Sequence, residues 1–279
     1  MTNIDFFKQT CYRISELITK KYSTSFSLAV SLLEKEERKA IYAIYGFVRL
    51  ADEIVDSFDG FDKEFLLEKL KSDLDYALLN GISTNPVILA FVDTVKKYRI
   101  EKKFIDAFIR SMEYDLYKTN YKTQHELEQY IYGSAEVVGL MCLKVFCKED
   151  ENLFSELVPY AKSLGSAFQK VNFLRDINAD MNKLGRIYFP EIHSSTFDEK
   201  NKQTIIDSIE KDFEHAKKGI KKLPGKAKLA VSLAYHYYRS LLNKIKKVPV
   251  SEILSRRIRV PNLQKIAIFL KVYVLNIFF

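Results

Sequence analysis

The sequence predicts an all-α protein, and three observations support this fold class. Only nine glycines and six prolines occur among the 279 residues, so few positions break a helix. No stretch alternates apolar and polar residues for long, whereas apolar residues recur at helical spacing along most of the chain. The hydrophobic share of 47% and the charged share of 29% are ordinary for a globular protein and argue against disorder.

Ten helices follow from this periodicity, with short breaks between them. Pro86, Pro224 and Pro261 mark three of the starts, because proline is favoured in or just before the first turn. We expect an interruption near Gly133 or Gly139. No linker, low-complexity tract or fixed repeat is present, so a single domain over residues 1–279 is expected. The helices are expected at 4–20, 34–57, 62–79, 86–99, 101–119, 124–146, Glu151–Met181, 198–222, 225–247 and 262–277, with a loop over 184–196.

Cysteine usage and charge narrow the class of protein. The three cysteines, Cys11, Cys142 and Cys147, match no metal-binding spacing and are interpreted as buried reduced thiols of a cytoplasmic protein. The net charge of +8 is concentrated between Lys211 and Arg259. Such a balance suits nucleic acid, anionic lipid or a phosphorylated substrate equally well. Because no nucleic-acid-binding motif accompanies it, no nucleic-acid partner is expected.

No apolar stretch of the sequence is expected to be long enough to span a membrane as a helix. The N-terminal residues lack the apolar run and cleavage site of a signal peptide. The apolar tail Ile266–Phe279 is too short to span a bilayer and contains Lys271. Two interpretations of the tail stay open, a final core helix and a helix that rests on a membrane surface.

The predicted helix over 34–57 has acidic residues on its apolar face. Asp52 and Asp56 stand one turn apart at the end of this face. This helix alone leaves two interpretations open. Either the two aspartates have a function, or they are ordinary surface acids, which are solvated or have Arg49 paired with Asp52 or Glu53. At 100° per residue, the face within an arc of roughly 100° consists of Ile41, Tyr45, Val48, Arg49, Asp52 and Asp56.

The long helix Glu151–Met181 has a row of polar side chains that packing does not explain. The row begins at a small residue, Gly165, and continues with two amides and two carboxylates. Buried carboxylates without a partner would cost several kcal/mol, and metal ions are their natural partners. The row consists of Gly165, Gln169, Asn172, Asp176 and Asp180, at spacings of 4, 3, 4 and 4.

Two such helices packed side by side would face four carboxylates toward one another across a cavity. Hard oxygen ligands suit Mg²⁺, with Mn²⁺ as an acceptable substitute. Zinc is not expected, since the four histidines are scattered and form no HxxxH pair. Four arginines are candidates to bind diphosphate oxygens, namely Arg49, Arg175, Arg186 and Arg257.

Carboxylate-held Mg²⁺ and arginines around a diphosphate would make that group a good leaving group. The remaining substrate would be an allylic cation, which needs an apolar and partly aromatic cavity that excludes water. Twenty Phe and seventeen Tyr residues are available for its walls, although most of them must be core. A two-carboxylate hydrolase fits less well, because its chemistry uses two opposed groups rather than two pairs.

Five segments resemble the squalene/phytoene synthase family, and together they extend over nearly the whole chain. Ala43–Asp56, AIYGFVRLADEIVD, is similar to the first aspartate-rich motif of that family. Phe168–Pro190, FQKVNFLRDINADMNKLGRIYFP, is similar to the second motif and the Arg-x-Tyr-x-Pro loop. The other three are Ser23–Leu33, similar to a flap segment, Tyr130–Gly139, similar to a tunnel-lining helix, and the late positions Tyr238 and Arg257.

Two departures accompany the resemblance. Glu53 stands where many members have Asp, and Tyr22 stands where some have His. Neither removes one of the four aspartates. The second departure affects one expected contact to phosphate.

The resemblance implies a helical bundle of the isoprenoid synthase type with a central cavity, and it implies site residues. The catalytic set is Asp52, Asp56, Asp176 and Asp180, which hold the metal together with Asn172. The substrate-binding set is Ser25, Phe26, Tyr45, Arg49, Tyr130, Gln169, Asn172, Arg175, Arg186, Tyr238 and Arg257.

The activity implied is a prenyltransferase that joins two prenyl diphosphates head to head. The expected reaction condenses two geranylgeranyl diphosphates to phytoene through a cyclopropylcarbinyl diphosphate, for carotenoid biosynthesis. Squalene or dehydrosqualene synthesis from two farnesyl diphosphates is the nearest alternative. NADPH is not expected, because no GxGxxG fingerprint is present. Since the product is an insoluble hydrocarbon, we also expect loose peripheral association with the inner face of the membrane.

Two alternatives belong to other classes of protein. An inactive family member could act as an assembly or binding protein, but loss of an aspartate would be its signature and all four are present. A helical scaffold or nucleic-acid binder is supported only by the positive charge, and it leaves the row from Gln169 to Asp180 unexplained.

Overall fold

The computed structural model describes residues 2–192 and 197–278. In these residues the chain is helical, and the only strand-like feature is an isolated bridge between Asn120 and Ile187. The elements are α1 (Asn3–Tyr22), α2 (Thr24–Val30), α3 (Lys35–Ser57), α4 (Lys63–Asn80), α5 (Pro86–Lys97), α6 (Lys102–Tyr117), α7 (Gln124–Ile131), η1 (Tyr132–Glu136), α8 (Val137–Cys147), α9 (Glu151–Lys183), α10 (Glu199–Ile220), α11 (Gly225–Lys247), α12 (Val250–Ile253) and α13 (Asn262–Phe278).

All ten predicted helices are present, with ends within two residues of the expected ones. Two short helices, α2 and α12, were not expected. The predicted interruption lies at Gly133 rather than Gly139, because Gly133 falls within the π-helical turn η1 between α7 and α8. The expected loop is confirmed over residues 184–192, and its last four residues lie outside the described part of the chain.

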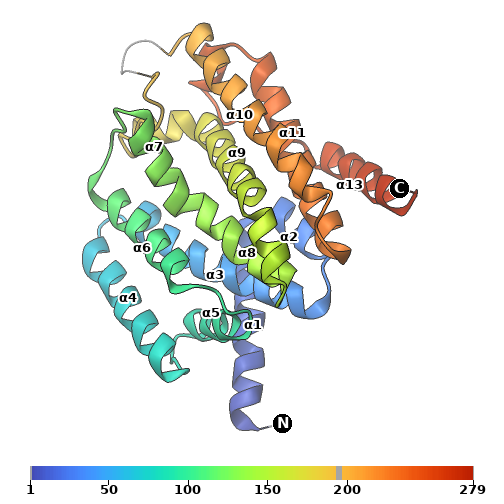
Figure 1. The fold of residues 1–279 in the computed structure, drawn as a ribbon. Helices are drawn as coiled ribbons and strands as arrows, with labels where there is room; N and C mark the ends of the chain where they lie inside the picture. Colours follow the sequence, from blue (N-terminus) through green and yellow to red (C-terminus); the bar gives the residue numbers. More distant parts are fainter. Residues whose placement is uncertain (1, 193–196, 279) are drawn as a thin grey trace.

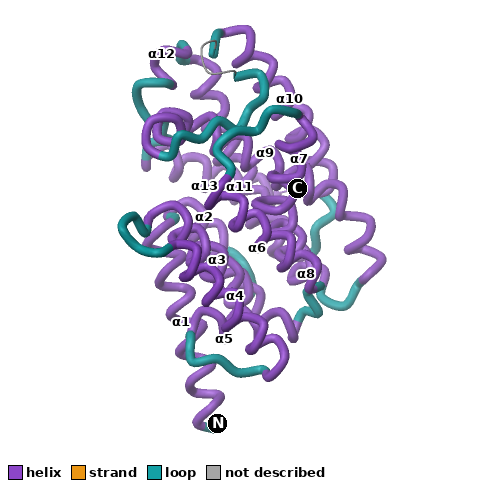
Figure 2. The backbone as a smooth tube through the Cα atoms, turned by 90° about the vertical axis from the view of Figure 1, so that its left-hand side faces the viewer, coloured by secondary structure: helices purple, strands orange, loops and turns teal. Residues whose placement is uncertain are grey.

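The core has two main parts, one from each half of the chain. Side chains of α3 to α8 form the larger apolar cluster. Side chains of α9 to α12, together with Leu127, Tyr130 and Ile131 of α7, form the second. Figure 1 shows α9 crossing the middle of the molecule with α8 beside it, and α10 and α11 on the other side of α9. In the side view, α1, α3, α4 and α5 form a lower group and α9, α10 and α12 lie above it (Figure 2).

A cavity of about 790 Å³ lies where the two clusters meet. Its walls come from α2, α3, η1, α8, α9, α10 and α11, and from residues 257–260, 262 and 265. The expected central cavity is therefore present.

Of the two interpretations of the tail, a final core helix does not agree with the described residues. One face of α13 packs through Ile268, Phe269 and Val272 against apolar side chains of α2 and α11. The opposite face is exposed along its described length. In Figure 1, α13 lies at the edge of the molecule beside α11. Both faces of the helix have apolar side chains, but the protein covers only one of them.

One helical stretch in the described residues, Gln124–Cys147, has the length and hydropathy of a membrane span. This differs from the expectation that no stretch is long and apolar enough. Most of the stretch is buried, because its residues pack against α3, α6 and α9. The interior position explains its apolar composition, as a core helix is apolar on all sides.

Small residues let the cavity-lining helices approach closely. A Cβ at Gly165 of α9 would lie 2.9 Å from the carbonyl oxygen of Ala135 in the π-turn. A Cβ at Gly219 of α10 would lie 2.3 Å from the Cβ of Tyr160 in α9. Real Cβ atoms do not approach this closely, so both positions exclude any side chain at the observed helix separation.

We predict that Gly219→Ala destabilises the protein by about 1–3 kcal/mol, because the new methyl group overlaps atoms next to the Tyr160 backbone that cannot rotate away. Denaturant unfolding measures the change. Gly139→Ala is the matched control, since its Cβ would meet the Ala161 carbonyl oxygen at 3.3 Å. An equal or larger loss in the control would contradict the assignment of the tight contact to Gly219.

Candidate functional site

The cavity collects most of the residues predicted for the site. Ten of the fifteen line it, from α2, α3, α9, α11 and the segment before α13. The ten are Ser25, Phe26, Tyr45, Arg49, Asp52, Gln169, Asn172, Arg175, Tyr238 and Arg257. The other five, Asp56, Tyr130, Asp176, Asp180 and Arg186, lie outside the lining and are reached through the contacts described below.

Arg49 of α3 is held in place on two sides. Its guanidinium pairs with Glu53, one turn further along the helix, and not with Asp52. It also lies over the ring of Tyr22, 4.5 Å from the centroid, in a cation–π contact. Its Nε is buried without a hydrogen-bond partner among the described residues. The cavity therefore has a fixed cation with a donor to spare, which suits an anionic ligand.

Asp176 of α9 lies between two arginines. Its carboxylate accepts hydrogen bonds from Arg175, at 3.0 Å from Nε and 2.5 Å from Nη2. Arg257, which arrives from the segment before α13, contacts the same carboxylate at 2.6 Å from Nε. The sequence analysis named Arg257 as a candidate to bind diphosphate, and the resemblance placed it near that group, but neither assigned it a protein partner. The structure brings it to the second aspartate-rich helix across 81 residues of chain.

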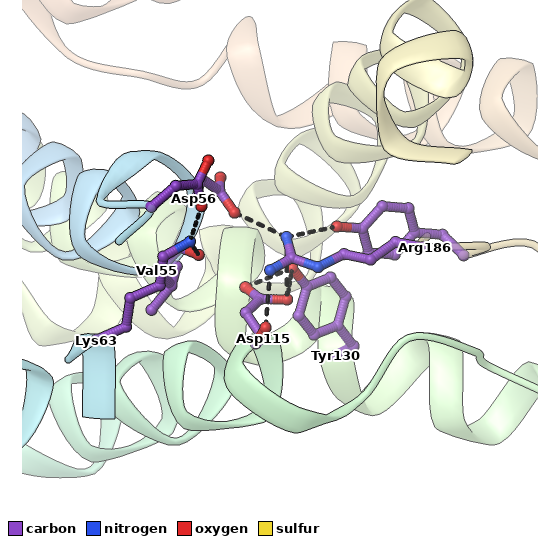
Figure 3. Close-up of polar contacts among 8 residues, drawn as sticks. Val55, Asp56, Lys63, Asp115, Tyr130 and Arg186 are labelled. Atoms are coloured by element: carbon purple, nitrogen blue, oxygen red, sulfur yellow. Dashed lines mark hydrogen bonds and ion pairs between the residues drawn. The ribbon is translucent and has the colours of Figure 1, made fainter. Parts of the chain in front are cut away.

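Arg186 joins the first aspartate-rich helix to α6. Its Nη1 donates to Asp56 at 2.7 Å, and its Nη2 donates to the backbone carbonyl of Asp115 at 2.7 Å. The Asp115 carboxylate lies 3.8 Å from Nη1. The Tyr130 hydroxyl is 2.8 Å from each carboxylate oxygen of Asp115. Figure 3 shows the guanidinium between Asp56 and Asp115, with the Tyr130 ring beside Asp115.

Tyr130 and Arg186 therefore differ from their expected roles. The resemblance puts Tyr130 on the tunnel wall, whereas the structure buries it in an aromatic stack with Tyr121, Phe173 and Tyr188. Arg186 is buried too, and it contacts a predicted metal ligand rather than the cavity. The sequence does not predict the contacts of either side chain, because their shared partner Asp115 lies on α6, far away in the chain.

Asp115 is the residue that the sequence analysis missed. It follows Phe104, Phe108 and Met112 on the buried face of α6, an acid on an apolar face like Asp52 on α3. The same criterion applied to α6 would have found it. Because its side chain is almost fully buried, it needs the partners that Arg186 and Tyr130 supply.

The carboxylates raise one another's pKa. Burial, with the neighbouring Asp56, raises the pKa of Asp52 to about 7, against the opposing effect of Arg49. Burial, with Asp176 and Asp56, raises the pKa of Asp180 to about 7. Both aspartate-rich helices line the cavity, and Arg186 links them, because its side chain donates to Asp56 of α3 and its backbone N–H donates to the Asp180 carbonyl of α9. The pKa of Asp115 is raised to about 7 by burial, which Arg186 opposes.

This donor set fits a hard divalent cation. All of its members are carboxylate or amide oxygens, and their mutual repulsion would be relieved by a cation between the helices. Among the residues that the structure describes, no three Asp, Glu, His or Cys side chains already converge closely enough to hold a metal. Arginines contact two of the aspartates instead, Arg186 at Asp56 and Arg175 with Arg257 at Asp176.

Away from the acids, the cavity is lined by aromatic and aliphatic side chains. Phe26 stacks on Tyr45 with centroids 4.9 Å apart, and Phe168 stacks on Tyr238 at 3.9 Å. The Tyr238 hydroxyl donates to the Asn172 side-chain oxygen at 3.3 Å. The deeper walls are Val30, Leu33, Ile41, Leu143, Phe146 and Leu157. The cavity is thus charged at one end and apolar along the rest.

Comparison with known proteins agrees with this geometry. The family model "Squalene/phytoene synthase" matches residues 19–264. The chain is 30% identical over 205 residues to a 4,4'-diapophytoene synthase of Staphylococcus haemolyticus, covering 72% of this chain and 68% of that protein. It is 28% identical over 279 residues to a 15-cis-phytoene synthase of Synechococcus elongatus, covering 91% and 90%.

A solved structure has the same fold. The crystal structure of a dehydrosqualene synthase in complex with a ligand superposes with a TM-score of 0.82 and 24% identity, over 98% of each chain. The fold is the all-α isoprenoid synthase fold of that enzyme. Since the family model matches most of the chain, including both aspartate-rich helices, the protein belongs to the squalene/phytoene synthase family.

Proposed function

We propose that the protein condenses two geranylgeranyl diphosphates head to head to phytoene, with release of diphosphate. The observation that supports this most strongly is the set of four aspartates on α3 and α9, two of them paired with arginines, beside an apolar cavity. Curated relatives named 15-cis-phytoene synthase, which match over 91% of the chain, favour the C20 substrate.

In the proposed reaction, Arg49, Arg175 and Arg257 bind diphosphate oxygens with guanidinium donors. Asp52, Asp56, Asp176, Asp180 and Asn172 would hold Mg²⁺. When bound, Mg²⁺ neutralises charge on the diphosphate and so assists its departure.

The remaining steps would take place between the two prenyl chains inside the cavity. The donor prenyl chain becomes an allylic cation, the double bond of the second molecule attacks it, and loss of a proton gives a cyclopropylcarbinyl diphosphate. After the second departure of diphosphate the cation rearranges, and loss of a second proton gives the linear hydrocarbon phytoene. The stacked rings of Phe26 with Tyr45 and of Phe168 with Tyr238 offer aromatic faces to the cation and exclude water.

A dehydrosqualene-type reaction with two farnesyl diphosphates is the second candidate. The relative named 4,4'-diapophytoene synthase, at 30% identity, favours it. The two candidates share every polar residue of the site and differ only in the length of prenyl chain that the apolar walls accept.

We predict a C40 hydrocarbon from geranylgeranyl diphosphate and Mg²⁺ without NADPH. The assay supplies each prenyl diphosphate separately, with and without NADPH, and identifies the hydrocarbon by mass spectrometry. A C30 product from farnesyl diphosphate alone would replace the first candidate by the second. If folded protein yields no hydrocarbon from either substrate, the inactive binding protein becomes the better interpretation.

We predict that Asp52→Asn and Asp176→Asn each lower turnover by at least about a hundredfold while the protein still folds. Each variant keeps the side-chain volume but removes a charge that the cation requires. Steady-state turnover and thermal unfolding are measured together. Asp207→Asn, at an exposed position of α10, is the control and should be unchanged. Normal activity in either site variant would refute the metal-ligand assignment.

Asp115 is proposed as a positioning residue that acts through Arg186. In Asp115→Asn, the Tyr130 hydroxyl keeps an acceptor, but Arg186 loses one of its two carboxylates. Arg186 should then pair more strongly with Asp56 and compete with the metal. We predict that the Mg²⁺ concentration for half-maximal activity rises roughly tenfold, with a smaller change in the KM for prenyl diphosphate.

A Mg²⁺ titration of turnover distinguishes this role from a structural one. If Asp115 served only the fold, Asp115→Asn would lower the melting temperature and leave the Mg²⁺ requirement of the folded fraction unchanged. That result would contradict the positioning role.

A further inference from the structure

The exposed face of α13 has no partner within the described protein. Leu263, Ile266, Leu270 and Val274 recur at spacings of 3, 4 and 4, so they share one side of the helix. All four are exposed. This side lies opposite Ile268, Phe269 and Val272, which pack against the protein. An exposed apolar face along a helix indicates a binding partner that covers it.

The sequence of α11, α13 and the segment between them is strongly basic, and six of its eleven cations form no ion pair with the described residues. From Gly225 to Phe279 the sequence has one acid, Glu252. Over the same range it has eleven cations, namely Lys226, Lys228, Arg239, Lys244, Lys246, Lys247, Arg256, Arg257, Arg259, Lys265 and Lys271. These residues belong to α11, to α13 and to the segment between them, and α11 is the helix on which α13 packs.

Individual cations lie close to α13 in space. Partial burial, together with nearby Lys271 of α13 and Lys217 of α10, lowers the pKa of His236 on α11. The Lys244 ammonium contacts the Arg259 backbone carbonyl just before α13 begins. An apolar strip bordered by cations is complementary to an anionic lipid surface, in which acyl chains lie beneath negative headgroups.

Another exposed apolar surface of the molecule lacks this charge pattern. On α4, Phe65, Tyr76 and Leu79 are exposed. That helix, however, has four acids (Glu64, Glu68, Asp73 and Asp75) beside three lysines. Anionic lipid would be repelled there as much as attracted, so α4 provides a natural control surface.

The first turns of α13 also belong to the wall of the cavity. Asn262 and Lys265 line it. The Lys265 ammonium lies 3.4 Å from the Thr24 hydroxyl of α2, which lines the cavity too. The same helix therefore contributes its inner side to the cavity and leaves its outer side exposed.

We propose that the face Leu263–Ile266–Leu270–Val274 of α13 docks the protein on an anionic lipid bilayer. The consequence for catalysis rests on the proposed function. A docked enzyme would release its hydrocarbon product close to the acyl region, in which that product dissolves.

The test uses the full chain and vesicles of phosphatidylcholine alone or mixed with phosphatidylglycerol. Flotation should show binding to the mixed vesicles that weakens as salt rises. Leu263→Glu with Leu270→Glu should lower the binding constant roughly tenfold or more, since two apolar contacts are replaced by charges that the anionic lipid repels.

The matched control is Leu79→Glu with Leu17→Glu. Leu263 and Leu79 are each 83% exposed, and Leu270 and Leu17 are 56% and 57% exposed. The two double variants thus make the same change of net charge at equally accessible leucines. The control should bind the mixed vesicles as the parent protein does, and circular dichroism should show both variants folded.

Three outcomes would overturn the proposal. They are no binding of the parent protein to phosphatidylglycerol vesicles, equal loss in both double variants, and a dimer in solution that only the α13 variant disrupts. The last would assign the face to a second copy of the chain, and sedimentation measures it. Flotation needs no turnover, so these results are independent of whether the protein makes phytoene.

Discussion

The balance between carboxylates and guanidinium groups where α3 faces α9 is the constraint on which the site depends. Two pairs of aspartates approach from facing helices, and burial with mutual repulsion raises the pKa of Asp52 and Asp180. Helices with such faces would not pack together without opposite charge between them. Arg186 supplies it at Asp56, and Arg175 with Arg257 supplies it at Asp176. The residues that compensate these charges are also suited to bind a metal and a diphosphate.

Arg186 links this balance to the rest of the fold. Its backbone N–H donates to the carbonyl of Asp180, while its side chain reaches Asp56 and Asp115. The next residue, Ile187, forms the bridge with the segment after α6. One buried residue therefore connects α3, α6 and α9. The Asp115 carboxylate lies next to the Arg186 guanidinium, and the Tyr130 hydroxyl donates a hydrogen bond to that carboxylate. A substitution at Asp115 on α6 therefore alters the contact between Arg186 and the predicted metal ligand Asp56 without changing a cavity-lining residue.

The apolar part of the cavity depends on a different feature, the close approach of helices at small residues. Gly165 meets the backbone of the π-turn η1, and Gly219 meets Tyr160. The π-turn adds an extra residue within the long helical stretch, and its residues Ser134 and Ala135 line the cavity. π-turns often occur at functional sites because they redirect side chains locally. The charged end and the apolar walls are thus set by separate elements that meet at α3 and α9.

The sequence by itself determined the helices and much of the site. Apolar periodicity and prolines located ten helices, because local spacing is all that a helix requires. Acids on apolar faces identified Asp52, Asp56, Asp176 and Asp180, since a charge in that position needs a partner. The short helices α2 and α12 were not predicted, because one or two helical turns contain too few residues to show a period.

Only the tertiary structure decided which partner each charge has. Arg49 pairs with Glu53 rather than Asp52, Arg186 is enclosed by Asp56 and Asp115, and Tyr130 supports Asp115 instead of lining the cavity. It also decided that α13 is covered on one side only. The physical reason is the same in each case. Helical periodicity reports which side chains share a face, whereas contacts between residues far apart in the chain depend on how whole helices pack.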